Sequence, residues 1–281
     1  MFGLFWSVPS DKIIILVIGY WSLERIFYPL TSTHYLLPIS HYEMSTLILV
    51  PQGAEYQAVC RGLSPVPLGK HGGATPTPHQ VLAIPMGIAP VQQYLQKLTQ
   101  KLTQKLTHIR ENSILMMGLC GSLTRKYQVG DIVLYQNCLY QGNLEECNNY
   151  FTTDIYTRLG DHVSLVRGLT SDRIVCTAAE KHHLHQQYGA DVVDMEGYPF
   201  LEFFRQFPDK QVAILRVVSD DSNHDIPNIT SAISENGSLR PFPLAWELIR
   251  QPQSARRLIT GSLKGLQALT AVTQLLFTSD P

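Results

Sequence analysis

The chain has 281 residues, of which 44% are hydrophobic and 16% are charged, and its 22 Lys and Arg are balanced by 23 Asp and Glu. This length suits one large α/β domain, because hydrophobic cores stop growing at about 250 to 300 residues. The balanced charge argues against nucleic acid as a partner. The five cysteines form no CxxC pair or metal-ligand spacing, so we expect reduced thiols in a cytoplasmic protein and no metal site.

Residues 1–43 are expected to precede the fold as an extension of uncertain structure. The apolar run Ile13–Trp21 is far shorter than the ~20 residues that a membrane-spanning helix needs. No clear signal-peptide cleavage site follows it. Two interpretations are favoured: residues 1–43 form a poorly packed extension, or the sequence is given from an upstream start codon and Met44 is the functional start. A signal peptide and a weak membrane-surface association through residues 11–30 stay open, and we place the domain at residues 44–277.

From Ser45 onward, apolar runs of strand length alternate with helical segments, which is typical of a largely parallel sheet covered by helices. The QKLT repeats within 96–107 predict an amphipathic surface helix, and the Pro- and Gly-rich residues 64–79 predict an irregular loop or hairpin. Residues 254–277 predict a final helix that closes the sheet and could also meet another subunit. We therefore expect a single-domain three-layer α/β sandwich with a mixed, mostly parallel central sheet. The predicted strands are Thr46–Val50, Gln80–Ile84, Ser113–Gly118, Asp131–Gln136, Ser164–Gly168, Asp191–Asp194 and Val212–Val218.

Four short segments follow predicted strands, at the edge where open parallel sheets bind ligands. The first strand leads into a helix with Glu55 in its opening turn, and the third ends in MGLCGSL, which contains Gly118 and Gly121. Two later strands end in carboxylates, Glu196 in VDMEG and Asp220 in RVVSD. Taken singly, each segment has a structural explanation: a helix-dipole position, a tight turn or a helix cap. Their joint order carries the functional hypothesis.

In this order, the four segments resemble the nucleoside phosphorylase and nucleosidase superfamily over about residues 44–232. Within it the chain looks most similar to the methylthioadenosine/S-adenosylhomocysteine nucleosidases. The resemblance implies hydrolysis of the N-glycosidic bond of a purine-type nucleoside through an oxocarbenium-like transition state. It also implies a homodimer that needs no cofactor.

Carried over by position, the resemblance assigns three acidic residues to the reaction. Asp220 would protonate the departing base, Glu55 would orient the attacking water, and Glu196 would hold the ribose hydroxyls. Six further positions would line the substrate: Met195 beneath the sugar, Ser219 as a proton relay, Gly87 and Gly118 at glycine turns, and Ile174 and Val175 through their backbone.

Hydrolysis is favoured over phosphorolysis because the expected phosphate ligands are missing. Phosphorolytic members of the superfamily generally have an arginine at the position of Met116 and a hydroxyl residue at that of Leu119. A bound phosphate without charge-assisted donors would be costly. Arg61 or Arg125 could still supply a cation, so a phosphate-dependent phosphorylase stays the first alternative. A noncatalytic nucleoside-binding or storage protein is the second.

Overall fold

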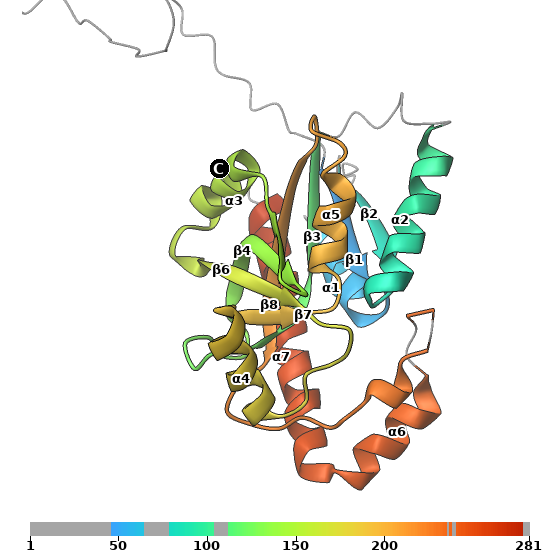
Figure 1. The fold of residues 1–281 in the computed structure, drawn as a ribbon, viewed down its shortest axis with the longest axis vertical. Coiled ribbons are helices and arrows are strands. Elements are labelled where there is room, and N and C mark those ends of the chain that lie inside the picture. The colour runs from blue at the N-terminus through green and yellow to red at the C-terminus, as the bar shows by residue number, and fades with distance from the viewer. Residues whose placement is uncertain (1–45, 65–78, 104–111, 235, 238–239, 278–281) are drawn as a thin grey trace, which may run out of the picture. The chain divides into compact units, whose positions relative to one another are not determined.

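The computed structural model describes residues 46–64, 79–103, 112–234, 236–237 and 240–277, which belong to one compact unit (Figure 1). The interpretation of residues 1–43 lies outside the described residues, as do positions 65–78 of the expected loop and the third QKLT copy at 104–107. The limits of the domain therefore stay a prediction. Among the described residues, no helix combines the length and the apolar character that crossing a membrane requires.

All seven predicted strands are present, most of them one to four residues longer than expected. They are β1 (Thr46–Pro51), β2 (Gln80–Ile84), β3 (Ser113–Ser122), β4 (Ile132–Tyr140), β6 (Val163–Thr170), β7 (Val192–Asp194) and β8 (Gln211–Asp220). The prediction missed β5 (Asn143–Glu146), which forms a hairpin with β4. Its turn is Gln141-Gly142, where both residues have positive φ (48° and 83°) as a two-residue hairpin turn requires.

The sheet is mixed and mostly parallel, as expected. Five strand pairs are parallel (β1–β2, β1–β3, β3–β8, β4–β6 and β6–β7) and three are antiparallel (β3–β7, β4–β5 and β4–β8). Because β8 pairs with both β3 and β4, the pairings β3–β7–β6–β4–β8 return to β3 and close a ring. The sequence did not indicate this closure, which brings the ends of β3, β7 and β8 together.

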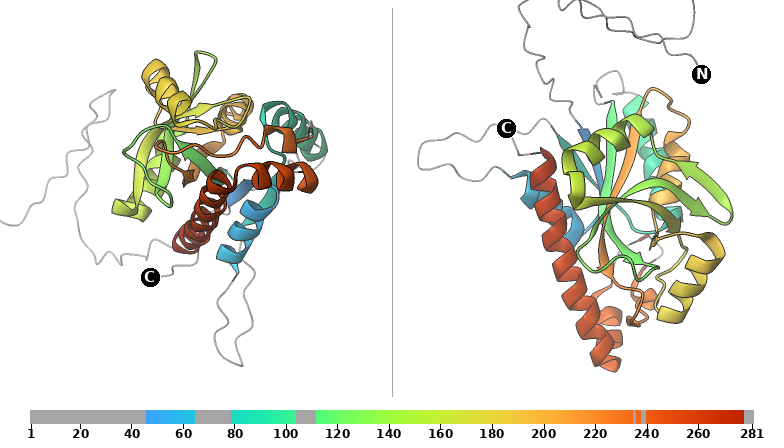
Figure 2. Two further views of the ribbon diagram at one scale, coloured as in Figure 1. Left: turned by 90° about the horizontal axis from the view of Figure 1, so that it is seen from below. Right: turned by 90° about the vertical axis from the view of Figure 1, so that its left-hand side faces the viewer.

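Helices cover the sheet on two sides and make the three layers (Figure 2). One core cluster lies beneath α2 (Ile88–Thr103) and α5 (Gly197–Phe204). The other lies beneath α1 (Ala54–Leu63), α3 (Asn149–Leu159) and α7 (Pro252–Phe277). The remaining helices are α4 (Ala178–Tyr188), α6 (Pro241–Arg250) and the short turns Gly160–His162 and Thr230–Ala232.

The predicted final helix is α7, and it approaches the end of β8 very closely. A Cβ at Gly261 would overlap the carbonyl oxygen of Ser219, and one at Gly265 would lie 3.0 Å from Leu119 Cδ2. Leu269 is buried beneath the helix, whereas Leu263 is 56% exposed on its outer side. The glycines thus let the helix support the backbone immediately before Asp220.

Candidate functional site

The site centres on Arg216, a fully buried residue of β8. Its Nε and Nη2 donate to Asp194 Oδ2 at 3.1 and 2.8 Å, and Nη2 also lies 3.3 Å from Glu196 Oε2. These carboxylates raise the pKa of the guanidinium although burial opposes its charge. Its Nη1 has no hydrogen-bond partner among the described residues. A buried donor without a partner is the kind of group that donates a hydrogen bond to a ligand or to a water molecule.

Asp194 belongs to the scaffold. Its Oδ1 accepts hydrogen bonds from Thr170 Oγ1 at 2.8 Å and from Gly197 N at 3.1 Å, where α5 begins. With Oδ2 occupied by Arg216, the side chain has partners on both oxygens. Asp194 therefore joins β6, β7, α5 and β8 at one point and fixes the guanidinium.

Glu196 directly precedes α5 and faces the turn at Gly87. Its Oε1 accepts from Gly87 N at 3.0 Å. Gly87 has φ of 91°, a conformation that favours glycine, and a Cβ there would lie 3.9 Å from Met195 Cε. Burial raises the pKa of Glu196, and the nearby Arg216 opposes that shift. Gly87, Met195 and Glu196 thus lie together.

Glu55 lies in the first turn of α1, as predicted, and reaches the same cluster. Its Oε2 accepts from Leu119 N at 2.8 Å. Burial raises its pKa from 4.5 to about 7, against the lowering effect of Arg216. A Cβ at Gly118 would lie 2.5 Å from Glu55 Oε2 and would overlap Arg216 Nη1. Glycine at position 118 therefore keeps open the space where this carboxyl meets the guanidinium.

Asp220 is placed by a register shift between Cys120 and Gly121, where β3 pairs with β8. It lies opposite Gly121, whose Cβ would stand 2.8 Å from Asp220 Oδ2. Ser219 Oγ donates to Asp220 Oδ1 at 2.8 Å. Gly118 and Gly121 are three residues apart on β3, so the strand links Asp220 to the cluster around Arg216.

Lys181 is a site residue that the sequence did not reveal. It is fully buried, its Nζ forms an ion pair with Asp220 Oδ2, and it donates to the carbonyl of Asp221 at 2.7 Å. In the sequence it precedes a histidine-rich run on a polar helix, which gives no sign of burial. Arg216 was also missed, although the sequence carried a signal for it, since a charged residue inside an apolar strand needs buried partners.

The predicted base-contacting residues lie beside the segment that follows Asp220. Val175 is buried, and the Ile174 carbonyl accepts from Cys176 Sγ at 3.4 Å. The Cys176 carbonyl accepts from Ile226 N at 2.9 Å, which ties the two segments together. The role of Ile174 and Val175 toward a base stays a prediction.

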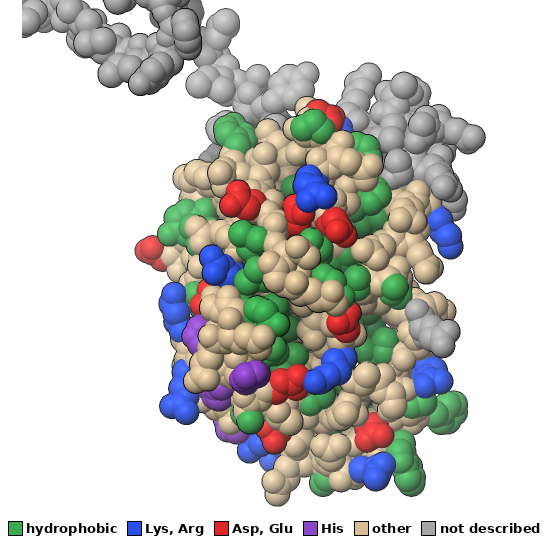
Figure 3. All heavy atoms as spheres, in the orientation of Figure 1, with side chains coloured by type: hydrophobic (Ala, Val, Ile, Leu, Met, Phe, Trp, Pro, Cys, Tyr) green, Lys and Arg blue, Asp and Glu red, His purple; other side chains and the backbone are tan. Residues whose placement is uncertain are grey.

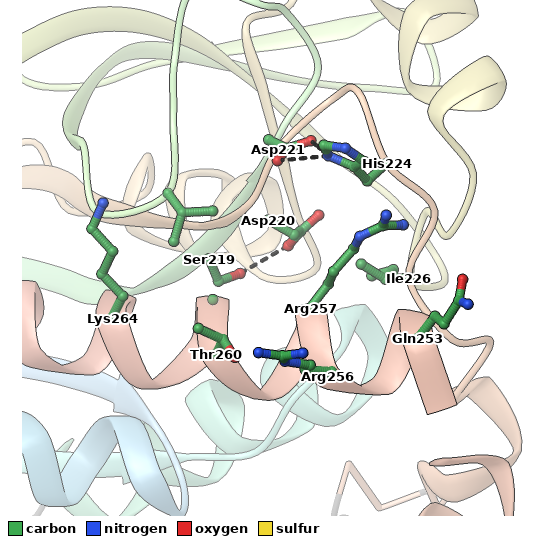
Figure 4. Close-up of a pocket in the computed structure, with 12 residues that line it drawn as sticks. Ser219, Asp220, Asp221, His224, Ile226, Gln253, Arg256, Arg257, Thr260 and Lys264 are labelled. Carbon is green, nitrogen blue, oxygen red and sulfur yellow. Dashed lines mark hydrogen bonds and ion pairs between the residues drawn. The ribbon is translucent and has the colours of Figure 1, made fainter. Parts of the chain in front are cut away.

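A pocket of about 570 Å³ opens beside Asp220 (Figure 4). Residues of the 219–226 segment line it from one side and α7 lines it from the other, with Arg257 and Lys264 among the α7 residues. Glu55, Glu196 and Arg216 do not line it. This pocket is therefore separate from the Arg216 cluster.

Comparisons with known proteins bear on the family and the fold of the chain. The family model of the phosphorylase superfamily matches residues 95–239, just over half of the chain. No curated protein matches the sequence.

Solved structures share the fold at low sequence identity. Futalosine hydrolase of Helicobacter pylori strain 26695 is 13% identical, with a TM-score of 0.55 over 83% of this chain and 97% of that one. The 5′-methylthioadenosine/S-adenosylhomocysteine nucleosidase of Helicobacter pylori is 14% identical, with a TM-score of 0.55 over 82% and 96%. The corresponding nucleosidase of Campylobacter jejuni is 13% identical, with a TM-score of 0.53 over 82% and 99%.

Proposed function

The chain belongs to the phosphorylase superfamily, and we propose that it hydrolyses the N-glycosidic bond of a purine-type nucleoside. Structures with the same fold include proteins named as a hydrolase and as nucleosidases. The observation that carries the proposal is the buried cluster in which the Glu55 carboxyl, with a pKa of about 7, lies beside the free Nη1 of Arg216.

In this mechanism Glu55 is the general base. A water between Arg216 Nη1 and Glu55 would accept a hydrogen bond from the guanidinium and donate one to the carboxylate. A base with a pKa near the working pH is effective, because a substantial fraction is ionised and still takes a proton readily. Holding a weak nucleophile in place supports a reaction in which the glycosidic bond loosens first.

Glu196 would bind the ribose. Each of its oxygens already has one donor, Gly87 N on Oε1 and Arg216 on Oε2, which fixes the orientation of the carboxylate. A carboxylate offers about four lone pairs, so two vicinal hydroxyls can still donate to it. Met195, beside Gly87, would pack beneath the sugar.

Asp220 would protonate the departing base. Its carboxylate is ion-paired with Lys181 Nζ and accepts a hydrogen bond from Ser219 Oγ, so the proton given to the base would first pass to Asp220 from one of these two donors. Backbone groups of Ile174 and Val175 would contact the base. Ser219 would serve as the proton relay to Asp220.

Water is favoured over phosphate as the nucleophile. Met116 is fully buried, its Sδ accepts a hydrogen bond from Arg216 Nη2 at 3.2 Å, and Leu119 N already donates to Glu55. Arg61 is exposed on α1, and Arg125 lines a surface hollow away from this cluster. None of these groups replaces the phosphate ligands that a phosphorylase needs.

Base release from a nucleoside panel tests the proposal. The panel includes methylthioadenosine and S-adenosylhomocysteine and is assayed in phosphate-free buffer and again with phosphate. We expect free base and free sugar in both. A strict phosphate requirement would assign the protein to the phosphorylases, and tight nucleoside binding with no base release would favour a storage protein.

Glu196→Gln provides the matching variant test. We expect weaker binding of ribose-containing ligands and a much smaller effect on free adenine. Glu202→Gln, on α5 and bonded to Gln92 Nε2, is the control and should change neither. We further propose a cytoplasmic homodimer, which analytical ultracentrifugation of the full chain would test.

A further inference from the structure

Helix α6 carries large apolar side chains that the described structure leaves uncovered. Phe242, Trp246 and Ile249 are 89%, 62% and 72% exposed. Their spacing of four and three residues places them on one face of the helix. Figure 3 shows hydrophobic side chains gathered over α6 at the lower right. Single exposed apolar residues are common, but a stripe with two aromatic rings marks an interaction surface.

The chain around this stripe is basic. Residues 240–264 contain five Lys and Arg against one acidic residue, Glu247, which gives a net charge of +4 in a chain whose net charge is −1. Arg250 is 62% exposed and lies 4.0 Å from Glu247. Arg256 and Arg257 are exposed, and the described part of the chain gives neither an ion-pair partner. This segment of the chain therefore combines an exposed apolar stripe with an excess of positive charge.

We propose that α6 and the start of α7 dock on the surface of an anionic lipid bilayer. A short amphipathic helix lies in the plane of the interface, with aromatic and aliphatic side chains among the headgroups and basic residues at the phosphates. Phe242, Trp246 and Ile249 supply the first set, and Arg250 and Arg256 the second. Each basic residue near an anionic surface adds to the attraction, which explains the concentration of charge here.

Docking would also place the candidate site near the membrane. Gly237, four residues before α6, accepts hydrogen bonds from Gln52 Nε2 at 3.0 Å and Met86 N at 3.2 Å. Gln52 follows β1 and Met86 follows β2, at the sheet edge that also presents Glu55 and Gly87. The helix is therefore tied to the edge of the sheet that carries the cluster.

Trp246 fluorescence tests the proposal in the full chain. The other two tryptophans, Trp6 and Trp21, are replaced by Phe so that Trp246 reports alone. The probes are vesicles of phosphatidylcholine, with and without phosphatidylglycerol, and vesicles brominated on the acyl chains near the headgroup. We expect a blue shift and quenching of Trp246 in the anionic vesicles, weaker in phosphatidylcholine alone and weaker in high salt.

Vesicle co-sedimentation supplies the variant test. Phe242→Ser with Ile249→Ser should lower the bound fraction relative to free protein at least about tenfold. The control is Tyr150→Ser on α3, which removes a 69% exposed aromatic ring elsewhere and should leave binding unchanged. Vesicle binding that leaves Trp246 emission unaltered would overturn the proposal, because another segment would then be the anchor. A Trp246 signal that follows protein concentration and ignores vesicles would overturn it in favour of self-association.

Discussion

Replacing Glu55 by Gln should stabilise the fold above neutral pH while removing base release. Burial raises the pKa of this carboxyl from 4.5 to about 7. The folded protein therefore keeps its proton up to about pH 7, whereas the unfolded chain loses it near pH 4.5, so stability falls as pH rises through that window. A shift of roughly 2.5 pKa units corresponds to about 3 kcal/mol. This is an upper bound, because Glu55 is partly exposed to solvent.

Thermal unfolding of wild type and Glu55→Gln over a pH series measures this effect. Gln resembles the protonated acid, so the two melting temperatures should coincide near the bottom of the window and separate by up to roughly 6–12 °C above it. Base release should fall ~10²–10⁴-fold in the variant, and the wild-type rate should rise with pH through about 7. A melting-temperature gap that does not change with pH would refute the assigned cause. Glu202→Gln should show neither effect.

Three further substitutions probe the buried charges. Asp220→Asn should abolish base release and should lower the free energy of unfolding by ~3–5 kcal/mol, because it leaves Lys181 buried without its counter-charge. Adding Lys181→Met should restore part of the lost stability in thermal melts. Strictly additive effects of the two substitutions would contradict the coupling between Asp220 and Lys181. Gly118→Ala should lower turnover more than stability, since its Cβ would overlap Arg216 Nη1, and a wild-type kcat would refute this. Asp194→Asn should cost ~3–5 kcal/mol in denaturant unfolding, because it removes the main carboxylate partner of Arg216, and a loss below 1 kcal/mol would contradict that role.

The strands and the acidic residues of the site could be predicted because they follow from local pattern. Apolar runs mark β1, β3 and β8, and each leads into one of the polar or glycine-rich segments. The hairpin strand β5 carries no such pattern, since its sequence NLEE exposes Leu144 at 45% and reads as a loop. The closure of the sheet through β8 depends on pairing between distant strands, which local periodicity does not encode.

The two buried cations show a different limit. Arg216 lies in an apolar strand, where a buried charge requires carboxylates around it, but the sequence did not show which carboxylates these would be. Lys181 lies on a helix whose sequence is mostly polar, and only the fold turns it toward Asp220. A helix that packs one polar residue inward cannot be distinguished by periodicity from one that is fully solvated.

The charge balance of the cluster bears on the choice of nucleophile. Glu55, Asp194 and Glu196 surround the single guanidinium of Arg216, so even with one carboxyl protonated the negative groups outnumber the positive one. A phosphate dianion entering this site would meet that excess, and the guanidinium of Arg216 is already paired with Asp194 and Glu196. A sugar that develops positive charge as its glycosidic bond breaks would instead be stabilised, and a neutral water would not be repelled. The same carboxylates that make Arg216 tolerable in the core therefore favour an oxocarbenium-like sugar attacked by water.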